Sequence, residues 1–214
     1  MKGDPLPPFD FHCPLLSLPL AFGTEVTTIP ATERYLAALS TRSALWAGRL
    51  DGIDAPRIGL VWSGNIGQSN DANRSMSLET LLPVLKRMEF QFFALVKEVR
   101  SADRALMDSL PNVTDLSGHL TDFGETAAIL EHLDLLISVY TAVPHLAGAL
   151  GRPTWIMLSF VPDWRWLLDR ADCPWYPGAR LFRQRACNDW GSVIASLQAE
   201  LDRPDGRHCL PRTH

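Results

Sequence analysis

Short hydrophobic runs alternate with segments of helical spacing over most of the chain. The runs that indicate buried strands lie at residues 57–62, 91–96, 112–116, 134–139 and 153–158, the third of them weakly. The segments with helical spacing lie at residues 78–88, 102–110, 122–132, 141–150 and 189–201. Strands that alternate with helices at this spacing predict a parallel sheet with helices on both faces. Because crossovers between parallel strands are right-handed, the expected fold class is α/β, a Rossmann-like doubly wound parallel sheet.

The first 49 residues have a different pattern. The N-terminal segment is rich in proline, and Pro5, Pro7 and Pro8 indicate an extended linker. Residues 15–22 fit either a strand or a packed loop, and residues 31–49 have the spacing of a helix. The expected division of the chain is a linker with a helix, an α/β domain and a tail, over residues 1–49, 50–202 and 203–214.

The loop at residues 63–75 is the first candidate for ligand binding, because ligands of such sheets lie at the carboxyl ends of the strands. It is longer than a tight turn needs, and its glycines allow a ligand to approach the backbone closely. The donors that it offers to phosphate or sugar oxygens are Asn65, Asn70, Asn73, Arg74 and Ser75. The loop has no GxGxxG or Walker pattern, and a solvated loop without a ligand is the alternative.

Two further candidates follow later strands. Lys97 ends a strand, where its ammonium group would neutralise a diphosphate; an isolated surface lysine is the alternative. Residues 141–150 run from a tight turn into a helix of small residues, and the N-terminus of a helix attracts anions. Thr141 is expected to cap this helix, and His145 lies in its first turn. A helix that only packs against the sheet, with a hydrogen-bonded histidine, is the alternative.

Aromatic residues follow the last predicted strand, at 160–166 and again at 174–177. They suit the wall of a base or sugar site, and equally a lid over the core. No cluster of His, Cys, Asp and Glu has the spacing of a metal site, and no Ser-His-Asp spacing indicates a hydrolase. The sequence therefore predicts a site with no metal and no cofactor, and it singles out no catalytic residue.

Charge and cysteine usage narrow the range of partners. The net charge is −4 and the basic residues are scattered, which argues against binding to a nucleic acid. No apolar run reaches the length of a membrane span, and no export signal is recognisable. The four cysteines stand alone, which favours free thiols and a cytoplasmic location.

Several motifs in combination carry a family resemblance. They are VWSGN at 61–65 with ND at 70–71 and NRS at 73–75, ISV at 137–139 with TAV at 141–143 and HLAGALGRP at 145–153, PDWRW at 162–166 with PWYP at 174–177, and FDFHCPLLSLP at 9–19. Together they resemble the C-terminal, donor-binding domain of bacterial tetratricopeptide-linked glycosyltransferases. That family is related to the lipopolysaccharide heptosyltransferases of glycosyltransferase family nine. The resemblance spans nearly the whole chain.

The resemblance implies a GT-B enzyme with two Rossmann-like domains, in which the nucleotide sugar lies mainly on the C-terminal one. It implies that Lys97, Thr141 and His145 contact the diphosphate, helped by the loop from Asn65 to Ser75. Basic side chains and a helix N-terminus would stabilise the leaving group without a metal. Residues 1–49 would then hold a remnant of the acceptor domain and the crossover helix. A separate acceptor domain or a tetratricopeptide protein would supply the rest, including the acceptor base.

Three departures from the family pattern bear on this site. Tyr140 stands where the family usually has Asp, and Pro144 stands where it usually has Ala. Gln68 and Ser69 stand where the first loop usually carries His or Lys. These changes remove an anion and basic groups, and Pro144 also removes one amide from the first helical turn.

Two hypotheses of function follow. The first is the donor-binding domain of a glycosyltransferase, of hexosyl- or heptosyltransferase type, that recognises a nucleotide-diphosphate sugar and is incomplete as an enzyme without an acceptor domain. The second is a non-catalytic module, a degenerate glycosyltransferase, that binds a nucleotide or a partner or serves only for packing. Fold analogy does not decide between them.

Overall fold

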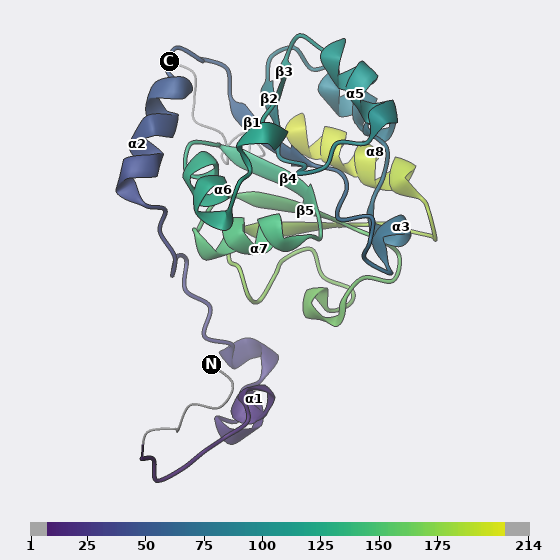
Figure 1. Cartoon of the computed structure of the whole chain (residues 1–214). Coiled ribbons are helices and arrows are strands. Elements are labelled where there is room, and N and C mark those ends of the chain that lie inside the picture. The colour runs from purple at the N-terminus through teal and green to yellow at the C-terminus, as the bar shows by residue number, and fades with distance from the viewer. Residues whose placement is uncertain (1–7, 204–214) are drawn as a thin grey trace.

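A six-stranded parallel sheet forms the centre of the molecule, in the order β3-β2-β1-β4-β5-β6 (Figure 1). The computed structural model describes residues 8–203. Its strands are β1 (Arg57–Val61), β2 (Gln91–Ala94), β3 (Val113–Asp115), β4 (Leu135–Val139), β5 (Thr154–Leu158) and β6 (Ala179–Arg183). Each neighbouring pair is parallel. The predicted fold class is therefore confirmed, and β6 is a strand that the sequence pattern did not predict.

Helices cover both faces of the sheet (Figure 1). One layer holds α2 (Ser40–Arg49), α6 (Phe123–Leu130) and α7 (Ala142–Ala149), and the other holds η3 (Leu78–Leu81), α4 (Leu82–Leu85), α5 (Ser101–Asp108) and α8 (Trp190–Leu201). The other short helices are η1 (Leu15–Ser17), α1 (Leu18–Ala21), η2 (Val26–Thr28), α3 (Asp71–Arg74), η4 (Ser117–His119) and η5 (Trp164–Trp166). Side-chain caps begin α6, α7 and α8; at α6 the Asp122 carboxylate accepts the Glu125 amide at 2.7 Å.

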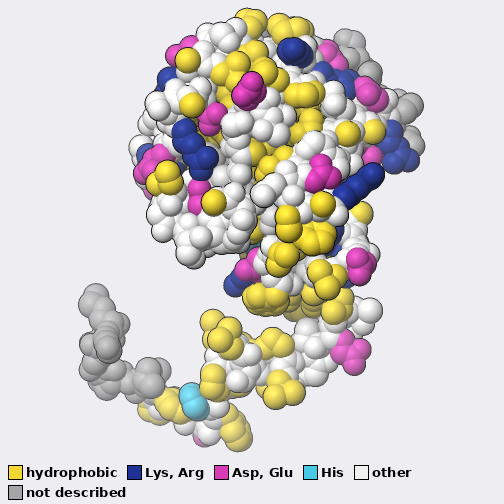
Figure 2. Space-filling view, turned by 90° about the vertical axis from the view of Figure 1, so that its right-hand side faces the viewer, with side chains coloured by type: hydrophobic (Ala, Val, Ile, Leu, Met, Phe, Trp, Pro, Cys, Tyr) yellow, Lys and Arg dark blue, Asp and Glu magenta, His cyan; other side chains and the backbone are white. Residues whose placement is uncertain are grey.

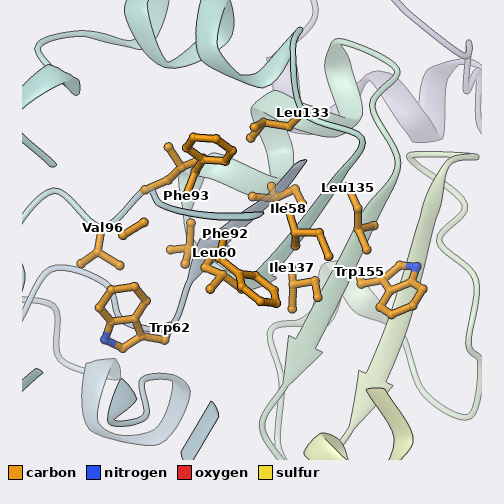
Figure 3. Close-up of a cluster of buried hydrophobic side chains, with 14 of the residues drawn as sticks. Ile58, Leu60, Trp62, Phe92, Phe93, Val96, Leu133, Leu135, Ile137 and Trp155 are labelled. Carbon is orange, nitrogen blue, oxygen red and sulfur yellow. The ribbon is translucent and has the colours of Figure 1, made fainter. Parts of the chain in front are cut away.

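The centre of the core is formed by strand residues on both faces of the sheet, with buried helix residues packed against them (Figure 3). Ile58, Leu60, Phe92 and Ile137 have no exposed surface. A parallel sheet between two helix layers needs such continuous apolar strands, which explains why the hydrophobic runs located them. A second cluster lies at β5 and β6, and comprises Tyr140, Ile156, Leu158, Trp166, Cys173, Ala179 and Leu181.

The predicted helix over residues 31–49 is wrong in its first half, because α2 begins only at Ser40. The amides of Tyr35 and Leu36 both donate to the carbonyl of Ala149, at 3.0 Å each. These amides are therefore used in a tertiary contact with the end of α7, which excludes helical bonding there. The predicted helix over 78–88 is divided into η3 and α4.

Residues 8–30 form an arm that extends from the sheet domain (Figure 1, Figure 2). None of its side chains is buried, and Phe11, Leu16 and Leu20 are 94%, 94% and 87% exposed. Residues 15–22 form two short helical turns there, instead of the predicted strand or packed loop. Pro8 belongs to this arm, whereas Pro5 and Pro7 lie outside the described residues. Over residues 8–203, no helix combines the length and the apolar character that a membrane span requires.

Candidate functional site

The strand order reverses between β1 and β4, and two cavities open at this switch point. In doubly wound sheets the crevice at that point is where ligands bind. We name the two cavities after the character of the residues that line them. The polar cavity, about 600 Å³, is lined by Asn70, Asn73, Arg74, Thr141, His145, Ser159, Asp163 and Gln184, among others. The apolar cavity, about 540 Å³, is lined by Val61, Asn65, Arg74, Leu95, Val96, Lys97, Phe123, Thr141 and Val143, among others.

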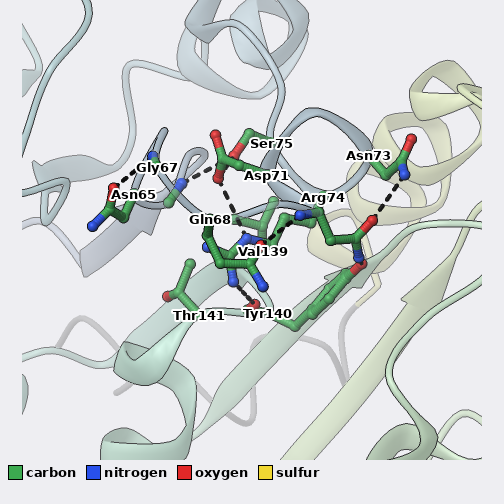
Figure 4. Close-up of polar contacts among 12 residues, drawn as sticks. Asn65, Gly67, Gln68, Asp71, Asn73, Arg74, Ser75, Val139, Tyr140 and Thr141 are labelled. Carbon is green, nitrogen blue, oxygen red and sulfur yellow. Dashed lines mark hydrogen bonds and ion pairs between the residues drawn. The ribbon is translucent and has the colours of Figure 1, made fainter.

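The loop at residues 63–75 is folded around a buried carboxylate (Figure 4). Asp71 is 3% exposed, and its two oxygens accept hydrogen bonds from Ser75 at 2.7 Å, Arg74 at 3.3 Å and Arg100 at 2.8 Å. Ser75 in turn accepts the amide of Gly64 at 3.0 Å. These bonds give the loop one defined shape at the mouths of the cavities. The loop is thus more than a solvated connection.

A close approach inside this loop requires a glycine. A Cβ atom on Gly64 would lie 2.5 Å from Nη2 of Arg74 and 2.9 Å from Oδ1 of Asp71. The guanidinium of Arg74 also donates to the carbonyl of Tyr140 at 3.4 Å, so it connects the loop after β1 to the end of β4. The absence of a side chain at Gly64 therefore keeps Arg74 between the two cavities.

The N-terminus of α7 lies between the same cavities, with Thr141 and Ala142 lining both. The Thr141 hydroxyl accepts the amide of Val143 at 3.4 Å, which confirms the predicted cap. Of the first three helical residues, Ala142 and Val143 carry amides and Pro144 carries none. This helix end consequently presents few amides to an anion, and the side chains around it matter more.

Tyr140 replaces the expected acid with a buried phenol that joins three loops. Its residue exposure is 7%, and its ring belongs to the second hydrophobic cluster. The hydroxyl accepts a bond from Asn70 at 3.3 Å and lies 2.9 Å from the hydroxyl of Ser159. Because Ser159 donates to the Val161 carbonyl, Tyr140 is the donor toward Ser159. The loops after β1, β4 and β5 are therefore connected through one side chain.

His145 is held by two aromatic rings at the edge of the polar cavity. Its ring stacks on Trp166 with centroids 5.0 Å apart, and its Nδ1 lies 3.0 Å from the Tyr176 hydroxyl. Burial lowers the pKa of His145, and the charge of Arg165 lowers it further, against the opposing effect of Asp163. The imidazole is therefore neutral at pH 7. It can exchange hydrogen bonds with a ligand, but it does not supply a positive charge.

The small residues of α7 make room for this aromatic arrangement. Ala147 and Ala149 are buried, as expected of a helix that packs closely. Gly148 faces the ring of Tyr176, and a Cβ atom there would lie 2.4 Å from Cγ of Tyr176. Gly151 ends the helix with a φ of 69°, a left-handed conformation that favours glycine.

The predicted ligand-binding residues lie at one edge of the sheet, but they divide between the cavities. Asn65 and Lys97 line the apolar cavity, whereas Asn70, Asn73 and His145 line the polar one. Arg74 and Thr141 line both. Ser75 lines neither, because it is buried in the loop at 7% exposure.

Sequence reasoning missed Gln184, which follows the unpredicted strand β6. Its side-chain oxygen accepts the amide of Phe160 at 3.0 Å, and the residue lines the polar cavity. Within residues 8–203 its buried Nε2 has no hydrogen-bond partner. The role of Asp71 was also missed, although its spacing of four from Ser75 on a short helical turn was a visible signal.

Comparison with known proteins places this geometry in a fold family. No protein-family profile matches the chain. Over 180 residues the chain is 27% identical to protein FlbA of Caulobacter vibrioides, covering 80% of this chain and 29% of that protein. Among solved structures, the ADP-heptose lps heptosyltransferase II of E. coli superimposes with a TM-score of 0.52 at 13% identity, covering 77% of this chain and 52% of that one.

A second solved structure is an enzyme of another class. The UDP-GlcNAc 2-epimerase of Neisseria meningitidis, bound to UDP-GlcNAc, has a TM-score of 0.52 at 13% identity and covers 80% of this chain and 44% of that one. The chain has the Rossmann-like fold of GT-B glycosyltransferases. It spans about half the length of these structures and less than a third of the length of FlbA. Since a transferase and an epimerase share the fold, the fold alone does not select the reaction.

Proposed function

We propose that the switch-point crevice binds a nucleotide-diphosphate sugar, as the donor-binding domain of a glycosyltransferase. The observation that carries this proposal is the position of Arg74 and the start of α7 between two cavities of different character. A nucleotide sugar has the same order of parts: an apolar base, an anionic diphosphate and a polar sugar. Each part has a matching place along the crevice.

The apolar cavity suits the base. Its walls include Val61, Leu95, Phe123 and Val143, which offer apolar surface to a flat ring. Lys97 is exposed at its rim, within the same cavity, where its ammonium group would approach the phosphates. This is the role that the family resemblance implies for it.

The region between the cavities suits the diphosphate. Arg74 contributes a guanidinium group, and the start of α7 contributes the amide of Ala142 and the hydroxyl of Thr141. A fixed cation and a helix N-terminus stabilise a leaving diphosphate without a metal ion. Since positions 68 and 69 carry no basic residue, we assign the diphosphate to Arg74 and Lys97.

The polar cavity suits the sugar, because its lining alternates donors and acceptors. Asn70 and Asn73 project from the loop, His145 from α7 and Gln184 from the end of β6. In the transfer, an acceptor oxygen would form a bond to the anomeric carbon as the bond to the diphosphate oxygen breaks. The acceptor proton would pass to a base, and the nucleoside diphosphate would leave. That base and the acceptor domain are assigned to a separate part of the enzyme.

Calorimetric titration of the chain with UDP and ADP, and with UMP and AMP for comparison, tests the proposal. We expect binding of a diphosphate in the range of about 0.1–1 mM and weaker binding of the monophosphates, because the second phosphate adds contacts to fixed cations. Lys97→Ala should weaken diphosphate binding about fivefold. Lys86→Ala, the same change at an exposed lysine just after the end of α4, should not alter this affinity.

The same preparation should transfer no sugar to a soluble acceptor. Efficient transfer by this chain alone would contradict the separate acceptor domain. The lack of binding to any nucleotide at millimolar concentration would favour the second hypothesis, a non-catalytic module that binds a partner or serves for packing.

Gly64→Ala should weaken ligand binding by displacing Arg74. The new methyl group would lie 2.5 Å from Nη2 of Arg74 and 2.9 Å from Oδ1 of the buried Asp71, so the guanidinium and its ion pair have to shift. We expect diphosphate affinity to fall about tenfold, since a charge-assisted hydrogen bond is lost. The free energy of unfolding should also fall, by about 1–3 kcal/mol, because the loop is overpacked around Asp71. An affinity equal to that of the wild type would show that Arg74 does not contact the ligand.

A further inference from the structure

A third cavity, about 540 Å³, lies beside the polar cavity and is lined mostly by aromatic rings. We call it the aromatic cleft; its main lining residues are Tyr35, His145, Trp164, Arg165, Trp175 and Tyr176. His145 and Arg165 also line the polar cavity, so the two spaces share a wall. Ile29 and Pro30, from the end of the arm, also line it.

The rings of the aromatic cleft are fixed and partly accessible. Trp164 and Trp175 stand at 87° with centroids 6.4 Å apart. The indole nitrogen of Trp175 donates to the Arg165 carbonyl at 2.8 Å, which sets its orientation. Trp164 is nevertheless 66% exposed, although it is large and apolar. The packing of the core does not account for a tryptophan held in this position.

The charges around the aromatic cleft are paired. The guanidinium of Arg165 contacts both carboxylate oxygens of Asp163, at 2.8 and 3.0 Å, and lies 4.8 Å from the centre of the Trp164 ring. The cleft therefore favours a neutral ligand over an anion or a cation. Polar groups at its wall are the hydroxyls of Tyr35 and Tyr176 and the neutral imidazole of His145.

We propose that the aromatic cleft binds a neutral hexopyranose unit of the acceptor. A pyranose ring has an apolar C–H face that packs on an indole, and hydroxyls that bond to the tyrosine and histidine groups. The volume suits one or two sugar rings. A peptide that bound by adding a strand would need an open sheet edge, and this cleft lies outside the sheet. The inference rests on the proposed function, because the shared wall is what brings the acceptor beside the donor sugar.

The test uses the full chain labelled with 5-fluorotryptophan and followed by fluorine NMR. The probes are the methyl glycosides of glucose, galactose and N-acetylglucosamine, with UDP and ADP titrated separately and a serine-containing peptide as the alternative acceptor. Trp164→Phe assigns the Trp164 signal and keeps an aromatic face. We expect the signals of Trp164 and Trp175 to shift with at least one glycoside, and the affinity to fall about fivefold in Trp164→Ala. Met88→Ala removes another exposed apolar side chain (61% exposed) and should leave the affinity for the glycosides unchanged.

The outcomes separate the two proposals. If UDP or ADP binds and no glycoside shifts the Trp164 signal, the acceptor inference fails and the proposed function stands. The inference also fails if Trp164→Ala binds glycosides as tightly as the wild type, or if only the peptide shifts the signal. If glycosides bind and no nucleotide does, the proposed function fails and the acceptor role fails with it.

Discussion

Asp71→Asn should lower the free energy of unfolding by about 3 kcal/mol, because it leaves the largely buried Arg74 and the partly exposed Arg100 without their buried anion. The Asp71 side chain is 4% exposed, and both of its oxygens bond to guanidinium or hydroxyl donors from Arg74, Arg100 and Ser75. Asparagine keeps the shape, but it has one acceptor oxygen and turns an N–H donor toward these groups. Urea denaturation at pH 7, followed by circular dichroism, measures the change.

A matched control for this prediction is Asp163→Asn, which breaks another arginine–aspartate pair in the same way. That pair is solvent-exposed, with side-chain exposures of 49% for Arg165 and 37% for Asp163. We expect a change within about 1 kcal/mol there, because exposed ion pairs contribute little. Equal losses in the two variants would show that the loop around Asp71 does not depend on its buried carboxylate.

Gly148→Ala should destabilise the protein by about 2 kcal/mol, through overpacking against an aromatic ring. A Cβ atom there would lie 2.4, 2.5 and 3.0 Å from three carbon atoms of Tyr176, so the ring has to leave α7. Because the Tyr176 hydroxyl lies 3.0 Å from Nδ1 of His145, the histidine loses its partner as well. Thermal and urea unfolding measure the loss, and the NMR signal of His145 reports the local change.

The same substitution at Gly48 provides a control of opposite sign. Gly48 lies in α2, and a Cβ atom there would meet no atom within 4 Å. Gly48→Ala should therefore stabilise the protein by roughly 0.5–1 kcal/mol through helix propensity. If Gly148→Ala also stabilised the protein, the ring of Tyr176 could not be packed directly against Gly148 of α7.

The sequence predicted those strands that are buried on both faces of the sheet, because such strands consist of a continuous run of apolar residues. β4 and β5 are of this kind, with every residue buried. β6 is an edge strand in which Arg180 and Arg183 are only half-buried, and Arg180 pairs with Glu200 of α8. A strand with arginines at such positions has no hydrophobic run to detect. Its existence depends on tertiary partners that a local pattern does not contain.

The sequence predicted at which edge of the sheet the candidate site lies, but not that its residues divide between two cavities. Parallel topology places the residues after each strand at one edge, so Arg74, Lys97 and Thr141 could be expected near one another. Their division between two cavities depends on where the loop folds, and that depends on the buried carboxylate of Asp71. The bridge from Tyr140 to Asn70 and Ser159 joins residues from three loops, and no spacing along the chain reveals it.

Arg74 lines both switch-point cavities, and a residue shared in this way would link them thermodynamically. A ligand group that moved this guanidinium in the apolar cavity would change the affinity of the polar cavity by some factor. Reciprocity requires the polar cavity to change the affinity of the apolar cavity by the same factor. The selectivity of each cavity for its end of a bound molecule would then depend on the residues of both cavities. Exchanging residues in one cavity would alter what the other prefers, without any change in the other's own walls.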